Sequence, residues 1–349
     1  MVGARVASPA SDGLAMPAEW VRHTRCWMAW PSRGPSWARA GGLGPARAAH
    51  VEVARAIARF EPVSMIARPA DMSEATRLLG RGIPVVALPV DDTWLRDTGP
   101  TFLSDGNGTL AATDWQFNAW GGKLAEFAAD ASIAERLLAR LGVRRYAAPM
   151  INEGGAVHVD GQGTAITTES VMLNANRNGA GREEVEDWLG DYLGVDTVIW
   201  LAAGLEGDDD TDGHVDNVAC FAGPGLVVAQ VCRDRADPNH DRLAENLARL
   251  RAATDNQGRP LEIIEIEQPA PRVVGGKRLP LSYINFYLAN GAVIAPVFDD
   301  PQDQAALAAL ARAFPAREVV PIRGATLCAG GGGIHCITQQ QPDPSAGLS

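Results

Sequence analysis

The stretch TGPTFLSDGNGTLAATD, residues 98–114, contains a pattern that recurs along the chain. Short runs of β-forming residues flank Gly106-Asn107-Gly108, and this arrangement is typical of a β-hairpin with a tight turn. Similar stretches at 156–168, 215–231 and 284–297 turn at Gly161-Gln162-Gly163, Gly223-Pro224-Gly225 and Asn290-Gly291. The turns begin 55, 62 and 67 residues apart, so the sequence predicts a degenerate structural repeat.

Each interval between the hairpins predicts a helix and a strand. Amphipathic spacing predicts helices at 48–60, 125–141, 182–193, 242–253 and 303–314. Short β-branched runs predict strands at 62–67, 83–88, 197–201, 261–266 and 318–322. Residues 24–67 and 319–338 would together complete a fifth ββα-type unit. We therefore expect an α/β fold in one closed domain, with an ordinary two-domain α/β protein carrying several hairpins as the alternative.

The composition describes a globular chain. Of its 349 residues, 46% are hydrophobic and 21% are charged, which excludes a disordered protein. The formal net charge of −11 repels phosphate backbones, so we expect no nucleic-acid partner. The sequence shows no signal-peptide pattern and no bilayer-spanning apolar run, and its five widely spaced cysteines favour free thiols. We expect a cytoplasmic protein that does not bind membranes.

Four segments combine rigid and reactive residues in a way that a protein core does not need. They are WLRDTGP (94–100), NEGG (152–155), DDDTDGHVDN (208–217) and GGGGIHCI (330–337). Each stands at the start of one repeat unit. Equivalent ends of the units converge on the axis of a radially repeated fold, so we expect these segments to form one site.

The residue types in these segments predict the chemistry of the site. A cysteine thiolate is a nucleophile, and a histidine exchanges protons near neutral pH. Several buried carboxylates require a cationic partner. The predicted ligand is therefore a compact cation with an electrophilic carbon, and a guanidinium has both that charge and a shape that carboxylates bind through paired N–H bonds.

Eight long motifs connect the chain to a known family. They are MPAEWVRHTRCWMAWP (16–31), DDTWLRDTGPTF (91–102), WQFNAWGGK (115–123), NEGGAVHVDGQGTAITTE (152–169), LNANRN (173–178), DTDGHVDN (210–217), SYINFYLANGAVIAPVF (282–298) and GGGGIHCITQQQP (330–342). Together they resemble the agmatine deiminases of the guanidino-group-modifying superfamily, which also contains arginine and bacterial peptidyl-arginine deiminases. The resemblance implies the pentein fold, a five-bladed pseudo-symmetric α/β propeller, for one catalytic domain at 16–342. We expect residues 1–15 and 343–349 to be flexible.

The resemblance also implies catalytic roles for particular residues of this chain. Cys336 in GIHCITQQ matches the nucleophile, and His214 in DGHVDN matches the general acid and base. Asp97 in WLRD and Asp216 in HVD match the pair that binds the guanidinium. Glu153 in EGG matches the carboxylate that completes the catalytic group.

Further residues are candidates for binding the substrate. Trp94 would stack on the guanidinium, unless it is simply a core residue. Asp210 and Asp212 would attract the ammonium at the far end of agmatine. Gly333 stands where the family usually has Asn in GGGNIHC, so we expect a looser loop and reduced turnover.

The activity implied by the resemblance is hydrolysis of agmatine to N-carbamoylputrescine and ammonia, in putrescine biosynthesis. The nucleophile would form a covalent S-alkylthiouronium intermediate, and no metal or organic cofactor would take part. The partner would be the small cationic guanidine itself. A homo-oligomer is compatible with the sequence, which does not determine the oligomeric state.

Other functions remain open at this stage. His214 and Asp216 could be metal ligands with His335 or Glu153 as a third, although His335 more simply orients the loop. A papain-like amide hydrolase would use the cysteine and histidine, but a neutral amide would leave the carboxylates unpaired. A non-catalytic guanidine or polyamine binder would need the acids only. Within the superfamily, a deiminase of free or peptidyl arginine is the main alternative.

Overall fold

The computed structural model describes residues 8–349, and its strands form five sheets of three or four strands. Four sheets follow the chain order: β4 (Thr101–Ser104), β5 (Leu110–Gln116) and β6 (Arg144–Ile151); β7 (Val157–Val159), β8 (Thr164–Thr168) and β9 (Thr197–Leu201); β10 (Ala219–Gly223), β11 (Leu226–Val231) and β12 (Glu262–Glu267); β15 (Tyr287–Ala289), β16 (Ala292–Val297) and β17 (Glu318–Arg323). In each of them an antiparallel hairpin is followed by a parallel third strand. The predicted repeat is therefore present in the structure.

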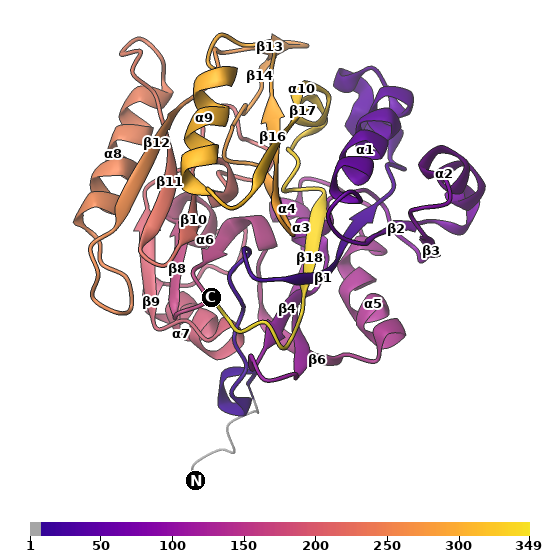
Figure 1. Ribbon diagram of the computed structural model, residues 1–349, viewed down its shortest axis with the longest axis horizontal. Coiled ribbons are helices and arrows are strands. Elements are labelled where there is room, and N and C mark those ends of the chain that lie inside the picture. The colour runs from indigo at the N-terminus through magenta and orange to yellow at the C-terminus, as the bar shows by residue number, and fades with distance from the viewer. Residues whose placement is uncertain (1–7) are drawn as a thin grey trace.

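The fifth sheet joins the two ends of the chain. It contains β18 (Thr338–Pro342), β1 (His23–Ala29), β2 (Val63–Ala67) and β3 (Val85–Ala87) in that order. Strand β18 pairs antiparallel with β1, which pairs parallel with β2, so this sheet repeats the pattern of the others. Figure 1 shows the yellow C-terminal strand beside the indigo N-terminal one.

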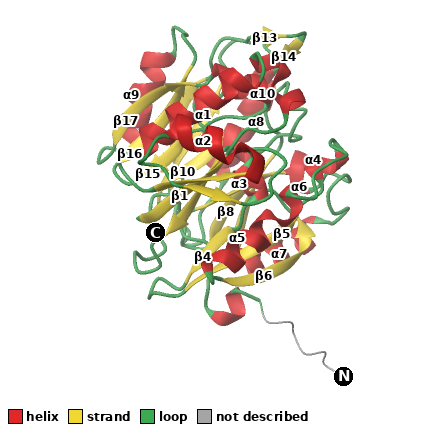
Figure 2. Ribbon diagram, turned by 90° about the vertical axis from the view of Figure 1, so that its right-hand side faces the viewer, coloured by secondary structure: helices red, strands yellow, loops and turns green. Residues whose placement is uncertain are grey.

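One long helix lies between the second and third strands of each sheet. These helices are α1 (Leu43–Ile57), α5 (Ile133–Leu141), α7 (Arg182–Leu193), α8 (Asn239–Ala252) and α9 (Asp303–Ala313). They lie around the outside of the molecule while the strands occupy its interior (Figure 1), and Figure 2 shows the strands between helices from a second side. In α1 the buried residues Ala46, Ala49, Val53 and Ile57 recur at helical spacing, which gives the helix one apolar face for the sheet.

The remaining elements are short. They are α2 (Met72–Leu79), α3 (Leu95–Thr98), α4 (Ala119–Gly122), α6 (Glu169–Met172), α10 (Ala325–Gly330), the hairpin β13 (Val273–Val274) and β14 (Lys277–Arg278), and the 3-10 helices η1 (Ala10–Asp12), η2 (Gly34–Ala40), η3 (Pro69–Asp71), η4 (Asp130–Ser132), η5 (Gly154–Ala156) and η6 (Val215–Asn217). No helix among the described residues is long and apolar enough to cross a bilayer.

The element predictions agree with the structure except at three places. The helix expected at 48–60 begins five residues earlier, at Leu43, and ends at Ile57. The helix expected at 125–141 begins only at Ile133, because Asp130 turns its carboxylate to the backbone N–H groups of Asp91 and Asp92 and a 3-10 turn precedes the helix. The segment 319–338, expected to belong to the fifth unit, is divided. Its first part is β17 of the preceding sheet, and it is β18, after Ile337, that completes the sheet with β1.

The ends of the chain pack on the domain where the structure describes them. Residues 1–7 lie outside the described part. From Ser8 onward the segment expected to be flexible forms η1, buries Leu14 and bridges Ala15 to Ser104. In the C-terminal segment, Leu348 accepts a hydrogen bond from Ala18 N through its backbone oxygen (2.8 Å).

A buried carboxylate connects the closing sheet to its neighbour. Glu61, 4% exposed, accepts hydrogen bonds from Tyr287 Oη (2.6 Å) and Asn290 N (2.8 Å), and lies 3.2 Å from His23 Nδ1. His23 belongs to β1 and Tyr287 to β15, so one side chain joins two sheets. Its removal would leave Asn290 N without its acceptor, and Tyr287 Oη and His23 Nδ1 with only each other as partners in this buried cluster.

We predict that Glu61→Ala lowers the free energy of unfolding by about 3 kcal/mol, because breaking a buried polar cluster on one side costs roughly 3–5 kcal/mol. The measurement is urea denaturation followed by circular dichroism. Glu52→Ala, at an exposed position of the neighbouring helix α1, is the control and should change stability by less than about 0.5 kcal/mol. Equal effects of the two substitutions would contradict the prediction.

Candidate active site

The candidate residues gather because they occupy the same place in successive repeats. Each stands just before the first strand of a sheet: Asp97 before β4, Glu153 before β7, His214 and Asp216 before β10, Asn285 before β15 and Cys336 before β18. Their side chains are all at most 5% exposed. The expected convergence of the segments on one site is therefore present in the geometry.

Cys336 lies at the inner wall of a cavity of about 200 Å³. Its Sγ accepts hydrogen bonds from Gly333 N (3.3 Å) and Asn285 Nδ2 (3.2 Å), and the thiol is 3.6 Å from Asp216 Oδ2. Burial and the charges of Asp216 and Asp97 raise the pKa of this thiol well above its ordinary value. Without a bound cation, Cys336 is therefore a neutral thiol.

His214 is fully buried among carboxylates. Its Nε2 lies 3.3 Å from Glu153 Oε2, and its Nδ1, 3.8 Å from Asp97 Oδ1, makes no hydrogen bond within the described chain. Burial alone would lower the pKa of this imidazole, but Asp97, Glu153 and Asp216 outweigh it and raise the pKa to about 9. His214 is therefore a cation at neutral pH, and can give a proton to a leaving group.

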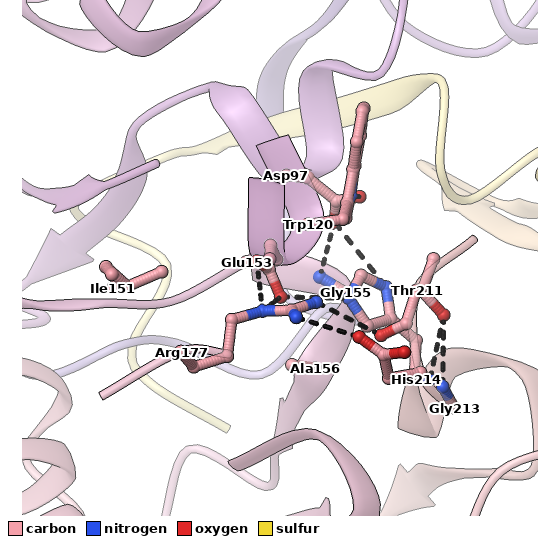
Figure 3. A network of polar contacts seen from close by, with 12 residues as sticks. Asp97, Trp120, Ile151, Glu153, Gly155, Ala156, Arg177, Thr211, Gly213 and His214 are labelled. Atoms are coloured by element: carbon pink, nitrogen blue, oxygen red, sulfur yellow. Dashed lines mark hydrogen bonds and ion pairs between the residues drawn. The ribbon is translucent and has the colours of Figure 1, made fainter. Parts of the chain in front are cut away.

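Arg177 holds Glu153 in place. Its Nε donates to Glu153 Oε1 (2.8 Å), while its Nη1 donates to Asp212 Oδ2 (2.8 Å), as Figure 3 shows for Glu153. Burial opposes the charge of Glu153, but His214 and Arg177 lower the pKa of its carboxyl group. Asp212 reaches Arg177 from a left-handed turn (φ +65°) that leads through Gly213 into His214. Glu153 is thus an oriented carboxylate behind His214.

Asp97 faces His214 across Gly155. Its Oδ1 accepts from Gly155 N (3.0 Å) and its Oδ2 from Trp120 Nε1 (2.9 Å), and Figure 3 shows Asp97 and Trp120 side by side above His214. Burial raises the pKa of this carboxyl group, with Asp216 and Glu153 acting in the same direction, and these effects outweigh the opposing charge of His214. Asp97 accepts no hydrogen bond from a cation, since the charged His214 Nδ1 is 3.8 Å away, so a positively charged ligand would be stabilised here.

Asp216 has a different environment. Its Oδ2 contacts His335 Nδ1 (2.9 Å), and its buried Oδ1 has no hydrogen-bond partner in the described chain. Burial raises the pKa of this carboxyl group, but His335, His214 and Arg96 lower it further than burial raises it. Asp216 is therefore ionised and keeps one oxygen free for a ligand.

Only some of the residues expected to bind the substrate line the cavity. Trp94, Asp97 and Asp210 line the cavity together with Cys336, whereas Asp212, Asp216 and Gly333 do not. Asp216 lies 3.6 Å from the Cys336 thiol and lines a separate small cavity. Trp94 is 7% exposed and stacks on Trp37 (ring centroids 5.4 Å apart, planes at 16°). It is thus both a core residue and part of the cavity wall.

Asp210 and Asp212 belong to the same loop but differ in their position relative to the cavity. Asp210 lies at the cavity mouth, where its Oδ2 pairs with Lys277 Nζ (2.9 Å) and faces Arg39 (3.6 Å). Asp212 is already shared between Lys123 (2.8 Å) and Arg177. Of the two, Asp210 is therefore the one positioned to meet the tail of a ligand.

Asn285 occupies the space beside Gly333. A Cβ on Gly333 would lie 2.3 Å from Asn285 Oδ1, so no side chain fits there in this arrangement. The Asn285 carboxamide donates to Cys336 Sγ and accepts from His335 N (3.0 Å), which ties the loop down. The expected loosening of the loop is therefore opposed by a side chain from another segment.

Sequence reasoning missed four residues that shape the site. They are Glu19, Trp120, Arg177 and Asn285. All four stand inside motifs quoted for the resemblance, but none has a nucleophilic or acid-base pattern of its own that would single it out. Their contacts are made across distant segments, so only the folded chain reveals them.

The arrangement as a whole combines a nucleophile, a proton donor and carboxylates, of which Cys336 and Asp97 line the cavity. A cysteine thiol and a protonated histidine beside the same buried carboxylates, on an α/β fold, are the groups that a cysteine-dependent hydrolase uses. Among residues 8–349, no group of three or more histidine, cysteine or carboxylate side chains is arranged to hold a metal ion.

Comparisons with known proteins identify the family. The model of the Porphyromonas-type peptidyl-arginine deiminase family matches residues 15–342. A relative from Streptomyces avermitilis is 48% identical over 97% of this chain and 99% of its own. The agmatine deiminase of Pseudomonas putida is 45% identical over 97% and 98%. The solved structure of agmatine deiminase from Enterococcus faecalis is 33% identical, with a TM-score of 0.93 over 98% and 99%. The chain belongs to the Porphyromonas-type peptidyl-arginine deiminase family.

We predict that Gly155→Ala lowers kcat/KM by roughly 100-fold or more, because displacement of reacting groups by about 1 Å can cost that much. A Cβ at this position would lie 2.6 Å from His214 Nδ1, 2.9 Å from Asp216 Oδ2 and 3.0 Å from Asp97 Oδ1. The measurement is ammonia release. Gly44→Ala, where a Cβ meets nothing within 4 Å, is the control and should retain activity. A fully active Gly155→Ala enzyme would show that the three groups do not need this close approach.

We predict that His214 titrates near pH 9 and carries its proton below that value, because three carboxylates surround it. Asp97→Asn removes one negative charge and should move the titration toward the ordinary pKa of about 6.5. The measurement is NMR of the six histidines, with the His214 signal assigned by its loss in His214→Asn. A wild-type titration near pH 6.5, or no change in Asp97→Asn, would contradict the electrostatic argument.

Proposed function

We propose that this chain is an agmatine deiminase, which hydrolyses agmatine to N-carbamoylputrescine and ammonia. The observation that carries the proposal is the position of the Cys336 thiol beside two buried carboxylates: Asp97 lines the same cavity, and Asp216, 3.6 Å from the thiol, has one oxygen without a partner in the described chain. A guanidinium supplies the missing charge. The family membership and the names of the relatives support the same reaction.

The proposed activity is accompanied by proposals for the fold, the metabolic role and the cellular location of the enzyme. The five sheets would close into a five-bladed α/β propeller, as one catalytic domain at 16–342, with the site on its axis. The product would serve putrescine synthesis. The free thiols of all five cysteines and the acidic charge favour a cytoplasmic enzyme with a small cationic substrate.

Binding of the substrate is the first step of the proposed mechanism. The guanidinium N–H groups donate to Asp97 and to the free Oδ1 of Asp216, which directs the central carbon toward Cys336. The new positive charge offsets the two carboxylates that raise the pKa of the thiol, so the thiol ionises more readily in the complex. The ligand therefore helps to activate its own nucleophile.

The chemical steps then follow in sequence. The thiolate of Cys336 forms a C–S bond to the guanidinium carbon, and protonated His214 gives its proton to one amino group, so that the C–N bond breaks and ammonia leaves. The S-alkylthiouronium remains. Neutral His214 takes one proton from water as the water oxygen attacks the same carbon. The C–S bond then breaks to return the thiolate, and the second water proton leaves to solvent as the neutral ureido product is released. Glu153 holds the imidazole throughout.

One observation favours the alternative substrate, arginine. Arg39 and Lys123 line the cavity, and either could bind an α-carboxylate. Both cations are already engaged, however: Arg39 faces Asp210 and Lys123 pairs with Asp212 at 2.8 Å. We therefore favour agmatine, whose ammonium would meet Asp210.

We predict that Cys336→Ala abolishes ammonia release from agmatine while the protein still folds. Cys336→Ser should be nearly as inactive, since a hydroxyl ionises far less readily than a thiol. Mass spectrometry during turnover should find an adduct on Cys336. Cys328→Ala is the matched control, because that buried thiol lies outside the cavity lining. Activity in Cys336→Ala, or an adduct on another cysteine, would refute the proposed mechanism. So would a metal requirement, in which a chelator abolishes the activity of the wild-type enzyme and added zinc restores it.

We predict that Asp210→Asn raises KM for agmatine about tenfold and narrows the preference over arginine. The substitution removes a carboxylate from the cavity mouth and frees Lys277 and Arg39, which would then attract the α-carboxylate of arginine. Asp209→Asn is the control, because that side chain is 83% exposed and does not line the cavity. A wild-type enzyme that prefers arginine or a C-terminal arginyl peptide would favour the alternative function instead.

A further inference from the structure

His335 lies between two carboxylates below the catalytic cysteine. Its Nδ1 is 2.9 Å from Asp216 Oδ2, and its Nε2 is 2.9 Å from Glu19 Oε1 and 3.1 Å from Glu19 Oε2. The ring is 3% exposed and does not line the substrate cavity. Because both ring nitrogens are taken up by carboxylates, the ring has no free donor for a substrate, although His335 directly precedes Cys336.

The contacts of His335 define its protonation. An ionised carboxylate only accepts hydrogen bonds, so a ring whose two nitrogens both face carboxylates must donate from both. A ring that does so is an imidazolium. His158, which faces the same Glu19 at 3.7 Å, provides a contrast: its Nδ1 accepts a hydrogen bond from Phe221 N, which requires an unprotonated nitrogen.

Charged and titratable groups from several different segments surround His335. Arg96 on α3 donates to Glu19 Oε1 (3.1 Å), and Glu19, His158, Asp216 and Cys220 line a small cavity with His335 itself. Burial and the nearby Glu19 and Asp216 raise the pKa of the Cys220 thiol well above its ordinary value, so it carries no charge. Two carboxylates thus face two cations, Arg96 and His335, in a closed interior.

The two carboxylates that would bind the guanidinium differ in one respect. Asp216 has His335 as a hydrogen-bonded partner, whereas Asp97 accepts hydrogen bonds only from the neutral donors Trp120 and Gly155 N and has the charged His214 3.8 Å away. The pKa of the Asp97 carboxyl group is raised chiefly by burial, whereas His335, His214 and Arg96 outweigh burial and lower that of Asp216. Of the pair, Asp216 is therefore the carboxylate whose charge is secured by a direct partner.

We propose that His335 is a positioning residue: an imidazolium fixed between Glu19 and Asp216, it keeps Asp216 ionised and in place 3.6 Å from the Cys336 thiol, where Asp216 would bind the substrate's guanidinium. Glu19 is also part of the proposal, because its negative charge keeps the His335 ring protonated at Nε2. The inference rests on the proposed function for the identity of the substrate. The protonation of His335, in contrast, is a property of the enzyme without substrate and can be tested independently.

The first experiment uses NMR of the wild-type protein with ¹⁵N-labelled histidine and no substrate. We expect the His335 ring, assigned by its loss in His335→Asn, to show two protonated nitrogens from pH 6 to 8. His158 should show one. Glu19→Gln should shift the His335 titration to lower pH. A His335 ring that is neutral at pH 7.5 in the wild type overturns the proposal, whatever the enzyme does to agmatine.

The second experiment measures the kinetics of agmatine hydrolysis as a function of pH. In His335→Asn the amide Nδ2 stands where Nδ1 stood, so it retains a donor to Asp216 but not the charge. We expect kcat/KM to fall about 10- to 100-fold, more in KM than in kcat, with the acid limb moved to higher pH because Asp216 protonates more readily. His335→Ala should lose more than His335→Asn, since it also loses the donor.

His158→Asn is the matched control, as it removes another buried histidine beside Glu19 that does not touch Asp216. Its acid limb should stay within about 0.3 pH units of the wild type, and thermal unfolding checks that each variant folds. An unshifted acid limb in a folded His335→Asn overturns the proposal. If the wild type releases no ammonia from agmatine, the proposed function fails, and the NMR result alone decides whether His335 is the fixed cation.

Discussion

Ionised carboxylates buried without solvent are the constraint on which this molecule depends. Glu19, Asp97, Glu153 and Asp216 are at most 5% exposed, and a carboxylate taken out of water needs a compensating charge or donor. Most of that compensation comes from distant parts of the chain: Arg96 and His335 meet Glu19, while Arg177 and His214 meet Glu153. Asp97 alone receives only neutral donors, and it faces the cavity.

The buried carboxylates differ in how fully nearby positive charges compensate them, and this difference explains how the site can be selective for a cation. Asp97 lines the cavity with Cys336, and Asp216, whose buried Oδ1 has no partner in the described chain, lies 3.6 Å from the same thiol, so the deficit of positive charge is next to the thiol. A guanidinium that enters completes the set of ion pairs and at the same time removes the cause of the raised thiol pKa. Binding and activation of the nucleophile are thus consequences of the same missing charge.

The repeat provides the geometry that the charges need. Because each functional side chain directly precedes the first strand of a sheet, five separate segments deliver one or two groups each to a common centre. The pairing of β18 with β1 completes the arrangement, since it brings Cys336 and His335, near the C-terminus, against Glu19 near the N-terminus. Glu61 reinforces the same closure from the outer side.

The sequence by itself predicted the repeating α/β pattern and the candidate catalytic residues. Hairpin turns and helical periodicity are local signals, so β9 and α7 were predicted with their observed bounds, and Cys336, His214 and the carboxylates were recognisable by residue type and motif. Tertiary structure decided what depends on contacts between distant segments: that Asp212 is taken up by Arg177 while Asp210 faces the cavity, that Asn285 fills the space beside Gly333, and that His335 lies between Glu19 and Asp216. Protonation states belong to the second group as well. The charge of a side chain depends on its burial and its neighbours, and both exist only after the chain has folded.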